Sequence, residues 1–144
     1  LSGCMIKNYT PELPDELKQN ASVSLGDFSY NCEICRNSEN VTVTVLDTNA
    51  KGMVMMYNGN DLSFVYEDYS YSVNAENLEK TNVAIVIYQV FEALLCDDTA
   101  SKKIENGYQY RGKIDLGEFV LIQNDDNTFK SITVIGPQMK IIFE

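Results

Sequence analysis

The chain has 144 residues, of which 44% are hydrophobic and 22% charged, a composition that fits one globular domain and excludes a disordered chain. Its formal net charge of −10 opposes contact with nucleic-acid phosphates and charge-driven adhesion to an anionic membrane. The longest apolar run, Val83–Tyr88, is far shorter than the roughly 20 residues of a membrane-spanning helix, so any membrane attachment would be covalent.

The chain begins with the residues LSGC, which match the bacterial lipobox. Small residues before Cys4 fit the cleft of a signal peptidase, and the cysteine thiol can then be acylated. Residues 5–14 are polar and contain two prolines, which predicts a tether. We therefore expect residues 1–14 to be a lipobox remnant and tether with lipid attachment at Cys4, stable with more than one acyl chain. An unlipidated start with an incidental cysteine is the alternative.

Three further cysteines are Cys32, Cys35 and Cys96. The spacing of the first two could indicate a redox pair or half of a zinc site. There is no second pair of this spacing and no histidine, and the pair lies in a strand-like stretch, not between a strand and a helix. Buried thiols or a structural disulfide are therefore favoured, and the pairing stays open.

Alternation of apolar and polar residues predicts the first strands. A brief helical turn is expected at 15–20, followed by a strand over Val23–Tyr30 with a bulge in its middle. Residues 41–45, VTVTV, predict a half-buried strand. Residues 51–73 predict consecutive hairpins, with a tight turn at 58–61, where Asn and Gly tolerate positive φ.

The pattern changes to a helical period over residues 75–96, which are too many for one strand. Wound as a helix, Val83, Ile87, Val90 and Leu94 form one apolar stripe with further apolar residues on both sides. A helix with so little polar surface is expected to be buried by other parts of the protein around most of its circumference.

Strand signals return after Gly107 and predict four more strands, over residues 108–115, 117–123, 129–136 and 138–144. The order is thus about five strands, one central helix and about four strands. It predicts an α+β fold: a curved antiparallel sheet or half-open β-barrel with a central apolar helix packed on its concave face.

The sequence offers little catalytic chemistry. It has no histidine, so the commonest general base is absent and serine or cysteine nucleophiles lack their usual partner. There is no glycine-rich phosphate loop, and the pairs Asp97-Asp98 and Asp125-Asp126 are expected to be solvated loop acids. We expect no enzyme activity, no catalytic residues, no cofactor and no metal site; acid–base catalysis or cation binding by the acidic pairs is the alternative.

The stretch Met53–Tyr57 is apolar on both strand faces, so one face must meet something other than the usual core. Methionine adapts to irregular or changing partners. Either the helix covers that face and the methionines fill gaps, or sheet and helix leave an apolar cavity for an acyl chain. The residues alone leave both interpretations open.

The order of these elements resembles the LolA/LolB lipoprotein-carrier superfamily from about Val41 to Glu144. The resembling stretches are GMVMMYNGNDLSFVYEDYSYSV, NVAIVIYQVFEALL and YRGKIDLGEFVLIQNDDNTFKSITVIGPQMKIIFE. The family fold is a half-open antiparallel barrel with helices in its mouth, and its members bind acyl chains in the apolar space between. The resemblance implies a single LolA/LolB-like domain over residues 15–144.

The resemblance also implies a ligand cavity between sheet and helix. Its lining would be Met53, Met55, Phe64, Tyr66, Val83, Ile87, Val90, Leu94 and Phe119. The carriers' functional arginine on an early strand has no assignable counterpart among Arg36 and Arg111, the only arginines of the chain.

We therefore expect an extracytoplasmic lipoprotein, anchored to the bacterial cell membrane through Cys4, that captures a lipid or other hydrophobic ligand such as an acyl chain. No nucleic acid partner is expected, and no particular protein partner is indicated. The alternative is a non-enzymatic surface module with a fully packed core, in which Tyr66, Tyr69 and Tyr71 face a protein or glycan. A continuous pocket between helix and sheet would favour the ligand-binding lipoprotein. A filled interior with exposed tyrosines would favour the surface module.

Overall fold

The computed structural model describes residues 9–74, 81–96 and 98–144, which form eleven strands and one α-helix. Cys4, the expected lipid-attachment residue, and Asp97 lie outside the described residues. The elements in chain order are β1 (Leu17–Leu25), β2 (Phe28–Arg36), β3 (Val41–Val45), β4 (Val54–Tyr57), β5 (Asp61–Tyr66), β6 (Tyr69–Asn74), α1 (Val83–Leu95), β7 (Ala100–Ile104), β8 (Gly107–Ile114), β9 (Gly117–Asn124), β10 (Phe129–Val134) and β11 (Met139–Phe143).

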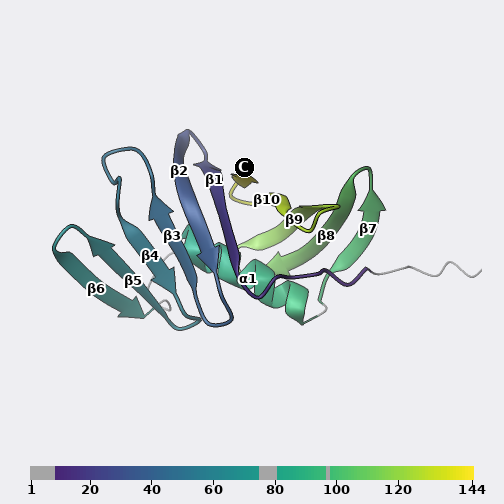
Figure 1. Cartoon of the computed structure of the whole chain (residues 1–144), viewed down its shortest axis with the longest axis horizontal. Helices are drawn as coiled ribbons and strands as arrows, with labels where there is room; N and C mark the ends of the chain where they lie inside the picture. The colour runs from purple at the N-terminus through teal and green to yellow at the C-terminus, as the bar shows by residue number, and fades with distance from the viewer. Residues whose placement is uncertain (1–8, 75–80, 97) are drawn as a thin grey trace, which may run out of the picture.

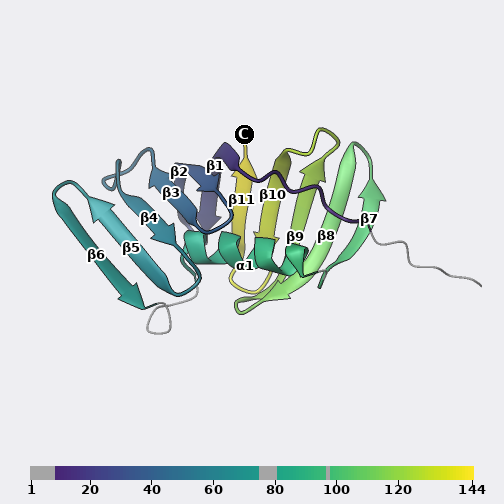
Figure 2. The same cartoon turned by 60° about the horizontal axis from the view of Figure 1, so that its bottom comes forward.

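All strands belong to one antiparallel sheet, ordered β6-β5-β4-β3-β2-β1-β11-β10-β9-β8-β7. It consists of two meanders, β1 to β6 and β7 to β11, joined by the pairing of β1 with β11 (Figures 1 and 2). β6 and β7 form its two ends, so the described sheet is open and not a closed barrel. The expected antiparallel sheet with a single helix is thereby confirmed.

Much of the predicted strand pattern is also confirmed. In β3 the three valines are buried, whereas Thr42 and Thr44 are half-buried on the other face. The turn between β4 and β5 contains Gly59 at φ +102°, and the Asn58 side-chain oxygen accepts hydrogen bonds from the backbone amides of Asn60 and Asp61. These are the local conformations that the Asn-Gly-Asn-Asp sequence favours.

The start of the domain differs from the prediction. Residues 15–20 do not form a helical turn, because β1 begins at Leu17 and is hydrogen-bonded between β2 and β11. Val23–Tyr30 is not one bulged strand, because Gly26 lies at φ +60° in a turn that separates β1 from β2. β7 was not predicted; it is a short edge strand with two consecutive lysines, which weakens the apolar signal of a strand.

The helix α1 begins after Asn82, whose side-chain oxygen accepts a hydrogen bond from the Ala84 amide at 2.9 Å. Eight of its 13 residues are buried, as the wide apolar arc predicted. α1 packs against β3, β4 and β8, strands that lie on opposite sides of the β1–β11 pair. No helix among the described residues combines the length and apolar character that a membrane crossing requires.

One apolar core lies between α1 and the sheet, and β6 and β7 contribute no residue to it. The Phe91 ring of α1 packs edge-on against Phe129 of β10, with 5.1 Å between the ring centres. The Tyr88 ring packs edge-on against Tyr57 of β4, with 5.0 Å between the ring centres. The Arg36 guanidinium lies 4.7 Å from the centre of the Phe91 ring. These contacts connect the helix to both meanders.

Residues 9–16 have no regular secondary structure and run beside the second meander (Figure 2). The Tyr9 amide donates to the Ser101 hydroxyl, and the Tyr9 ring lies 5.0 Å from that of Tyr108. The buried side-chain amide of Gln123 donates to the Glu12 carbonyl at 2.9 Å. The described part of the expected tether is therefore in contact with β7, β8 and β9.

Candidate functional surface

The structure places the predicted ligand-cavity residues in or beside the packed core. Six are buried at the junction of α1 and the sheet: Met55, Val83, Ile87, Val90, Leu94 and Phe119. Met53 and Phe64 are partly buried and pack against this group. Tyr66 lies outside it and donates its hydroxyl to the Asn49 carbonyl at 2.9 Å. Four of the six buried residues lie on α1 itself, Met55 lies on β4 and Phe119 on β9, and all six belong to one packed core.

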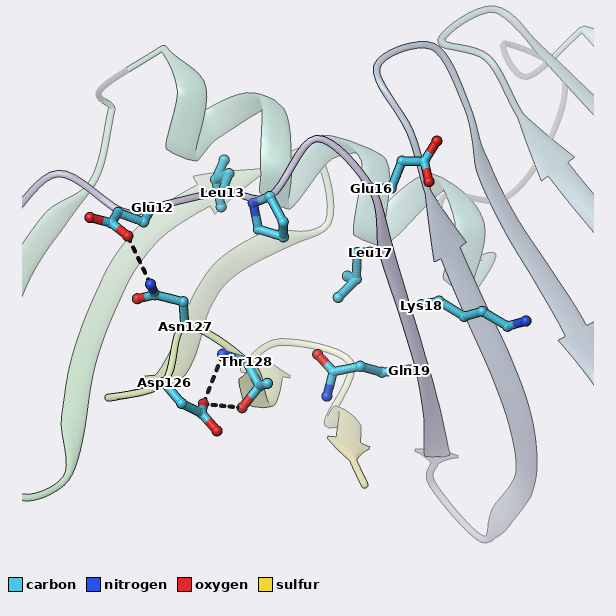
Figure 3. Close-up of a pocket in the computed structure, with 10 residues that line it drawn as sticks. Glu12, Leu13, Glu16, Leu17, Lys18, Gln19, Asp126, Asn127 and Thr128 are labelled. Atoms are coloured by element: carbon cyan, nitrogen blue, oxygen red, sulfur yellow. Dashed lines mark hydrogen bonds between the residues drawn. The ribbon is translucent and has the colours of Figure 1, made fainter.

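A pocket of about 460 Å³ lies elsewhere, between residues 12–19 and the turn that joins β9 to β10 (Figure 3). Its polar groups largely satisfy one another. The side-chain amide of Asn127 donates to the Glu12 carboxylate at 2.8 Å. The backbone amide and the hydroxyl of Thr128 donate to the same oxygen of Asp126, at 3.0 and 2.5 Å. These hydrogen bonds lower the pKa of Asp126, which matches the solvated turn acid that was expected.

The three cysteines within the described residues, Cys32, Cys35 and Cys96, are free thiols. Cys32 and Cys35 are three residues apart on β2 and point to opposite sheet faces, so they cannot form a disulfide with each other. Burial, with the charge of Asp47 as a smaller cause, raises the pKa of Cys32 to about 12. Burial and the neighbouring Glu33 also raise the pKa of Cys35. Neither group is poised as a nucleophile at neutral pH.

Within the described ranges, no three Cys, Asp or Glu side chains gather closely enough to hold a metal ion. Arg36, one of the two arginines of the chain, lies at the end of β2 with its charge against Phe91. Its desolvation lowers the pKa of the guanidinium, and Glu92 opposes that shift. The contact between Arg36 and Phe91 therefore links the helix to the first meander.

Two strongly exposed tyrosines, Tyr69 and Tyr71, lie on β6 beside Phe64 and Tyr66 of β5. We call Phe64, Tyr66, Tyr69 and Tyr71 the aromatic platform. They occupy the sheet face that bears α1, because Phe64 is paired with the buried Met55 of β4 and with Tyr71 of β6. β5 and β6 extend past the end of the helix (Figures 1 and 2), and Tyr69 and Tyr71 are 76% and 60% exposed.

The hairpin between β5 and β6 fixes the geometry of the platform. A two-residue turn, Glu67 and Asp68, joins the strands and pairs Tyr66 with Tyr69. The Phe64 and Tyr71 rings stack at 5.1 Å with an interplanar angle of 20°. The platform is therefore a pre-ordered aromatic surface flanked by two carboxylates, a combination that is frequent in binding surfaces and requires no catalytic group.

The structure brings together the three tyrosines that the sequence had grouped, Tyr66, Tyr69 and Tyr71. Phe64, assigned from the sequence to the cavity lining, joins them. The signal for this was available in the sequence, because Leu62, Phe64 and Tyr66 alternate along one strand and Tyr69, Tyr71 and Val73 along the next. What the sequence lacked was the extent of the helix, which leaves this end of the sheet uncovered.

No protein-family model matches this chain, and no curated protein is similar to it in sequence. Among solved structures, it matches a LolA superfamily protein from Nitrosomonas europaea with 12% identity, 90% of this chain and 69% of the other covered, and a TM-score of 0.43. It also matches a chain of the structure of the CwlD amidase from Clostridioides difficile in complex with the GerS lipoprotein, with 16% identity, 91% and 85% covered, and a TM-score of 0.56.

The second similarity shows a shared fold, and the identity is too low for it to show a shared function. The first alignment is looser and supports no further step.

Proposed function

We propose that this chain is a non-enzymatic, extracytoplasmic lipoprotein, anchored to the bacterial membrane through Cys4, whose LolA-like domain binds a protein partner through the aromatic platform. The observation that carries the proposal is the contrast between the two ends of the helix-bearing face. Under α1 the side chains are packed against one another, whereas Tyr69 and Tyr71 beyond the helix are open to solvent.

The chemistry of the platform favours a protein partner. Tyrosine presents a large apolar area with a hydroxyl at its edge and loses little conformational freedom on binding, so it is enriched among residues that dominate binding energy. Stacking with Phe64 already orders the exposed Tyr71 ring, and the β5–β6 pairing fixes the backbone position of Tyr69 beside Tyr66. Pre-ordering lowers the entropic cost of association.

The position of the tether agrees with this assignment. Tyr9 contacts β7 and β8, and the proposed anchor, Cys4, is only five residues earlier. The platform lies at the opposite end of the strand order, ten strand spacings away, or roughly 48 Å along the sheet. An anchor at the β7 end would leave the β6 end free to meet a partner away from the lipid.

The structural neighbour from Clostridioides difficile also supports a protein partner, because it comes from a complex of a lipoprotein with an amidase. An amidase similar to CwlD from the same organism as this chain is accordingly the first partner to test. The proposal does not depend on that choice, since the platform is defined by this chain's own residues.

Photo-crosslinking tests the proposal. A benzophenone amino acid at Tyr71 is compared with the same group at Phe28, which is 61% exposed but lies on β2. We expect a product with a different protein from position 71 only, and loss of the amidase or other captured partner when Tyr69 is replaced by alanine. Equal products from both positions, or none from position 71 in cells that contain the full chain, would contradict the proposal.

A hydrophobic ligand between α1 and the sheet is the second candidate function. It is favoured by one observation: four of the six buried lining residues lie on α1 itself, in one core with Met55 and Phe119 of the sheet. A helix of 13 residues is about 20 Å long, whereas β3 and β8 in a flat sheet would be about 29 Å apart, so contact with both requires a sheet that bends around the helix. If α1 moved as a lid, it would uncover a concave apolar face, and burial of an acyl chain there would contribute about 25 cal/mol per Å².

Native mass spectrometry of the domain, purified without detergent, separates the two candidates. A bare mass after incubation with mixed bacterial lipids is expected if the platform is the functional site. A lipid-sized adduct that is lost with Val90→Trp or Met55→Trp would instead establish the second candidate and identify its ligand class.

A further inference from the structure

The two edge strands of the sheet differ in a way that bears on pairing with another chain. β7, of sequence ASKKI, carries Lys102 and Lys103, and charges of this kind protect an edge from further strands. β6, of sequence YSYSVN, contains no charge and no proline and is rich in residues that favour strands. Within the described residues, β6 has a strand neighbour on one side only, which is β5.

The hairpin geometry determines which backbone groups of β6 face the open edge. A two-residue turn places Tyr66 and Tyr69 in a hydrogen-bonded pair, and such pairs recur at every second residue. Tyr69, Tyr71 and Val73 therefore direct their backbone groups toward β5. Ser70 and Ser72, which alternate with them, direct their N–H and C=O groups away from β5.

We propose that β6 pairs with β6 of a second copy of this chain, antiparallel, about a two-fold axis at Tyr71. This register joins Ser70 to Ser72 of the second copy, and both residues have the backbone groups that such a bond needs. Tyr71 then faces Tyr71 of the second copy in a non-hydrogen-bonded pair, where side chains approach most closely. Tyr69 faces Val73 of the second copy.

The side chains in this register match on both faces of the sheet. Tyrosine with tyrosine and tyrosine with valine are stabilising cross-strand pairs. Similar pairs already hold β5 to β6, where Tyr66 pairs with Tyr69 and Phe64 with Tyr71.

The opposite face is polar and equally well matched. Ser72 contacts the hydroxyl of Ser63 on β5 at 2.9 Å, and the proposed register places a serine beside another serine again. Asp68 would face Asn74 of the second copy, so the Asp68 carboxylates of the two copies do not face each other. A shift by one residue would place the aromatic side chains of one copy on the same face as the serines of the other, which disfavours it.

Pairing at β6 would join two aromatic platforms into one continuous surface, because Tyr69 and Tyr71 of both copies lie on the same sheet face. Two identical binding surfaces related by a two-fold axis fit a partner that is itself paired or that presents two equivalent segments. This extension rests on the proposed function, whereas the pairing of the two copies does not.

Disulfide trapping tests the pairing and its register. In the full chain with its four cysteines changed to alanine, Tyr71→Cys is compared with Val73→Cys. The Tyr71→Cys chains would meet at the two-fold axis and form a disulfide-linked dimer on mild oxidation. Two copies of Val73→Cys would stand four residues apart, roughly 13 Å, and remain unlinked.

Light scattering with size-exclusion chromatography supplies the second measurement. The chain is expected to have twice its mass of 16.2 kDa. Ser70→Pro, which removes an outward N–H and is tolerated on an edge, should restore the single-chain mass, whereas Ser70→Ala should keep the dimer. Circular dichroism checks that both variants remain folded.

A single-chain mass at the highest soluble concentration would overturn the pairing, as would cross-linking by Val73→Cys without cross-linking by Tyr71→Cys. These results are distinct from failure of the proposed function. A self-product in the benzophenone experiment has twice the chain mass, whereas a partner product does not. A monomer that still binds a partner through Tyr71 would leave the proposed function intact.

Discussion

Replacing Ile87 with alanine tests whether packed side chains fill the space between α1 and the sheet. Ile87 lies in the middle of α1 and is fully buried. The change removes three carbons, which costs about 2.4 kcal/mol at roughly 0.8 kcal/mol per buried methylene. A remaining cavity of about 50 Å³ adds about 1.2 kcal/mol. We therefore expect the free energy of unfolding to fall by about 3.6 kcal/mol.

Leu95→Ala is the matched control, because it removes the same number of carbons from the same helix at a side chain that is 57% exposed. Its effect should stay near 0.5 kcal/mol, typical of surface changes. Both free energies of unfolding are measured by urea denaturation, with the same slope of free energy against urea concentration for the two variants. If Ile87→Ala cost no more than Leu95→Ala, the space under the helix would not be filled, and the ligand-cavity interpretation would gain support.

Three further predictions concern other parts of the domain. Cys32, whose pKa burial raises to about 12, should react with iodoacetamide at pH 8 far more slowly than the exposed Cys96. Thr128→Val should lower the melting temperature at neutral pH, because the hydrogen bonds from Thr128 stabilise the ionised Asp126 and lower its pKa. This loss should shrink as the pH falls below the ordinary aspartate value of about 3.9 and through that lowered pKa. Gly107→Ala should destabilise the fold by at least about 1–3 kcal/mol, because a Cβ there would overlap a backbone carbonyl of β9.

Each of these predictions has a matched comparison. Equal labelling of the two cysteines in the folded chain would mean that β2 opens readily. Thr128→Ser keeps the hydroxyl and should preserve the pH dependence that Thr128→Val loses. Gly136→Ala introduces a methyl group with its nearest neighbour at an ordinary contact distance of 3.6 Å, so a comparable loss there would show that crowding is not the cause at position 107.

The parts of the fold that could be predicted from the sequence are those in which alternation alone decides the structure. β3, with valine and threonine in strict alternation, and the hairpins from β4 to β6 follow from local rules of strands and turns. The helix follows from its length and period. These elements require no knowledge of what lies beside them.

β1 could not be predicted because its polar residues are explained only by distant neighbours. Gln19 exchanges two hydrogen bonds with the backbone of Phe129, at 3.1 and 3.3 Å, across 110 positions of the chain. Its side-chain amide thus acts as an additional backbone unit of the sheet. A local pattern that treats glutamine and asparagine as loop or helix residues misses this.

The candidate surface was only half predictable for a related reason. The sequence grouped Tyr66, Tyr69 and Tyr71 as one possible binding patch, yet alternation could not show which sheet face carries the helix or where the helix ends. Phe64 was assigned to the interior because it shares a face with buried residues of β4. Its partial exposure follows from its distance along the sheet from α1, and no local pattern contains that distance.

The pairing of β1 with β11 has a consequence for the route by which the chain folds. Ala21 pairs with Phe143, so the sheet is completed only by contacts between residues more than a hundred positions apart. Such contacts have a high closure entropy and slow the search for the native state. Until Met139–Phe143 have left the ribosome, each meander keeps an additional open edge. The two halves therefore depend on Met139–Phe143, and the whole sheet is expected to assemble only after this strand has been made.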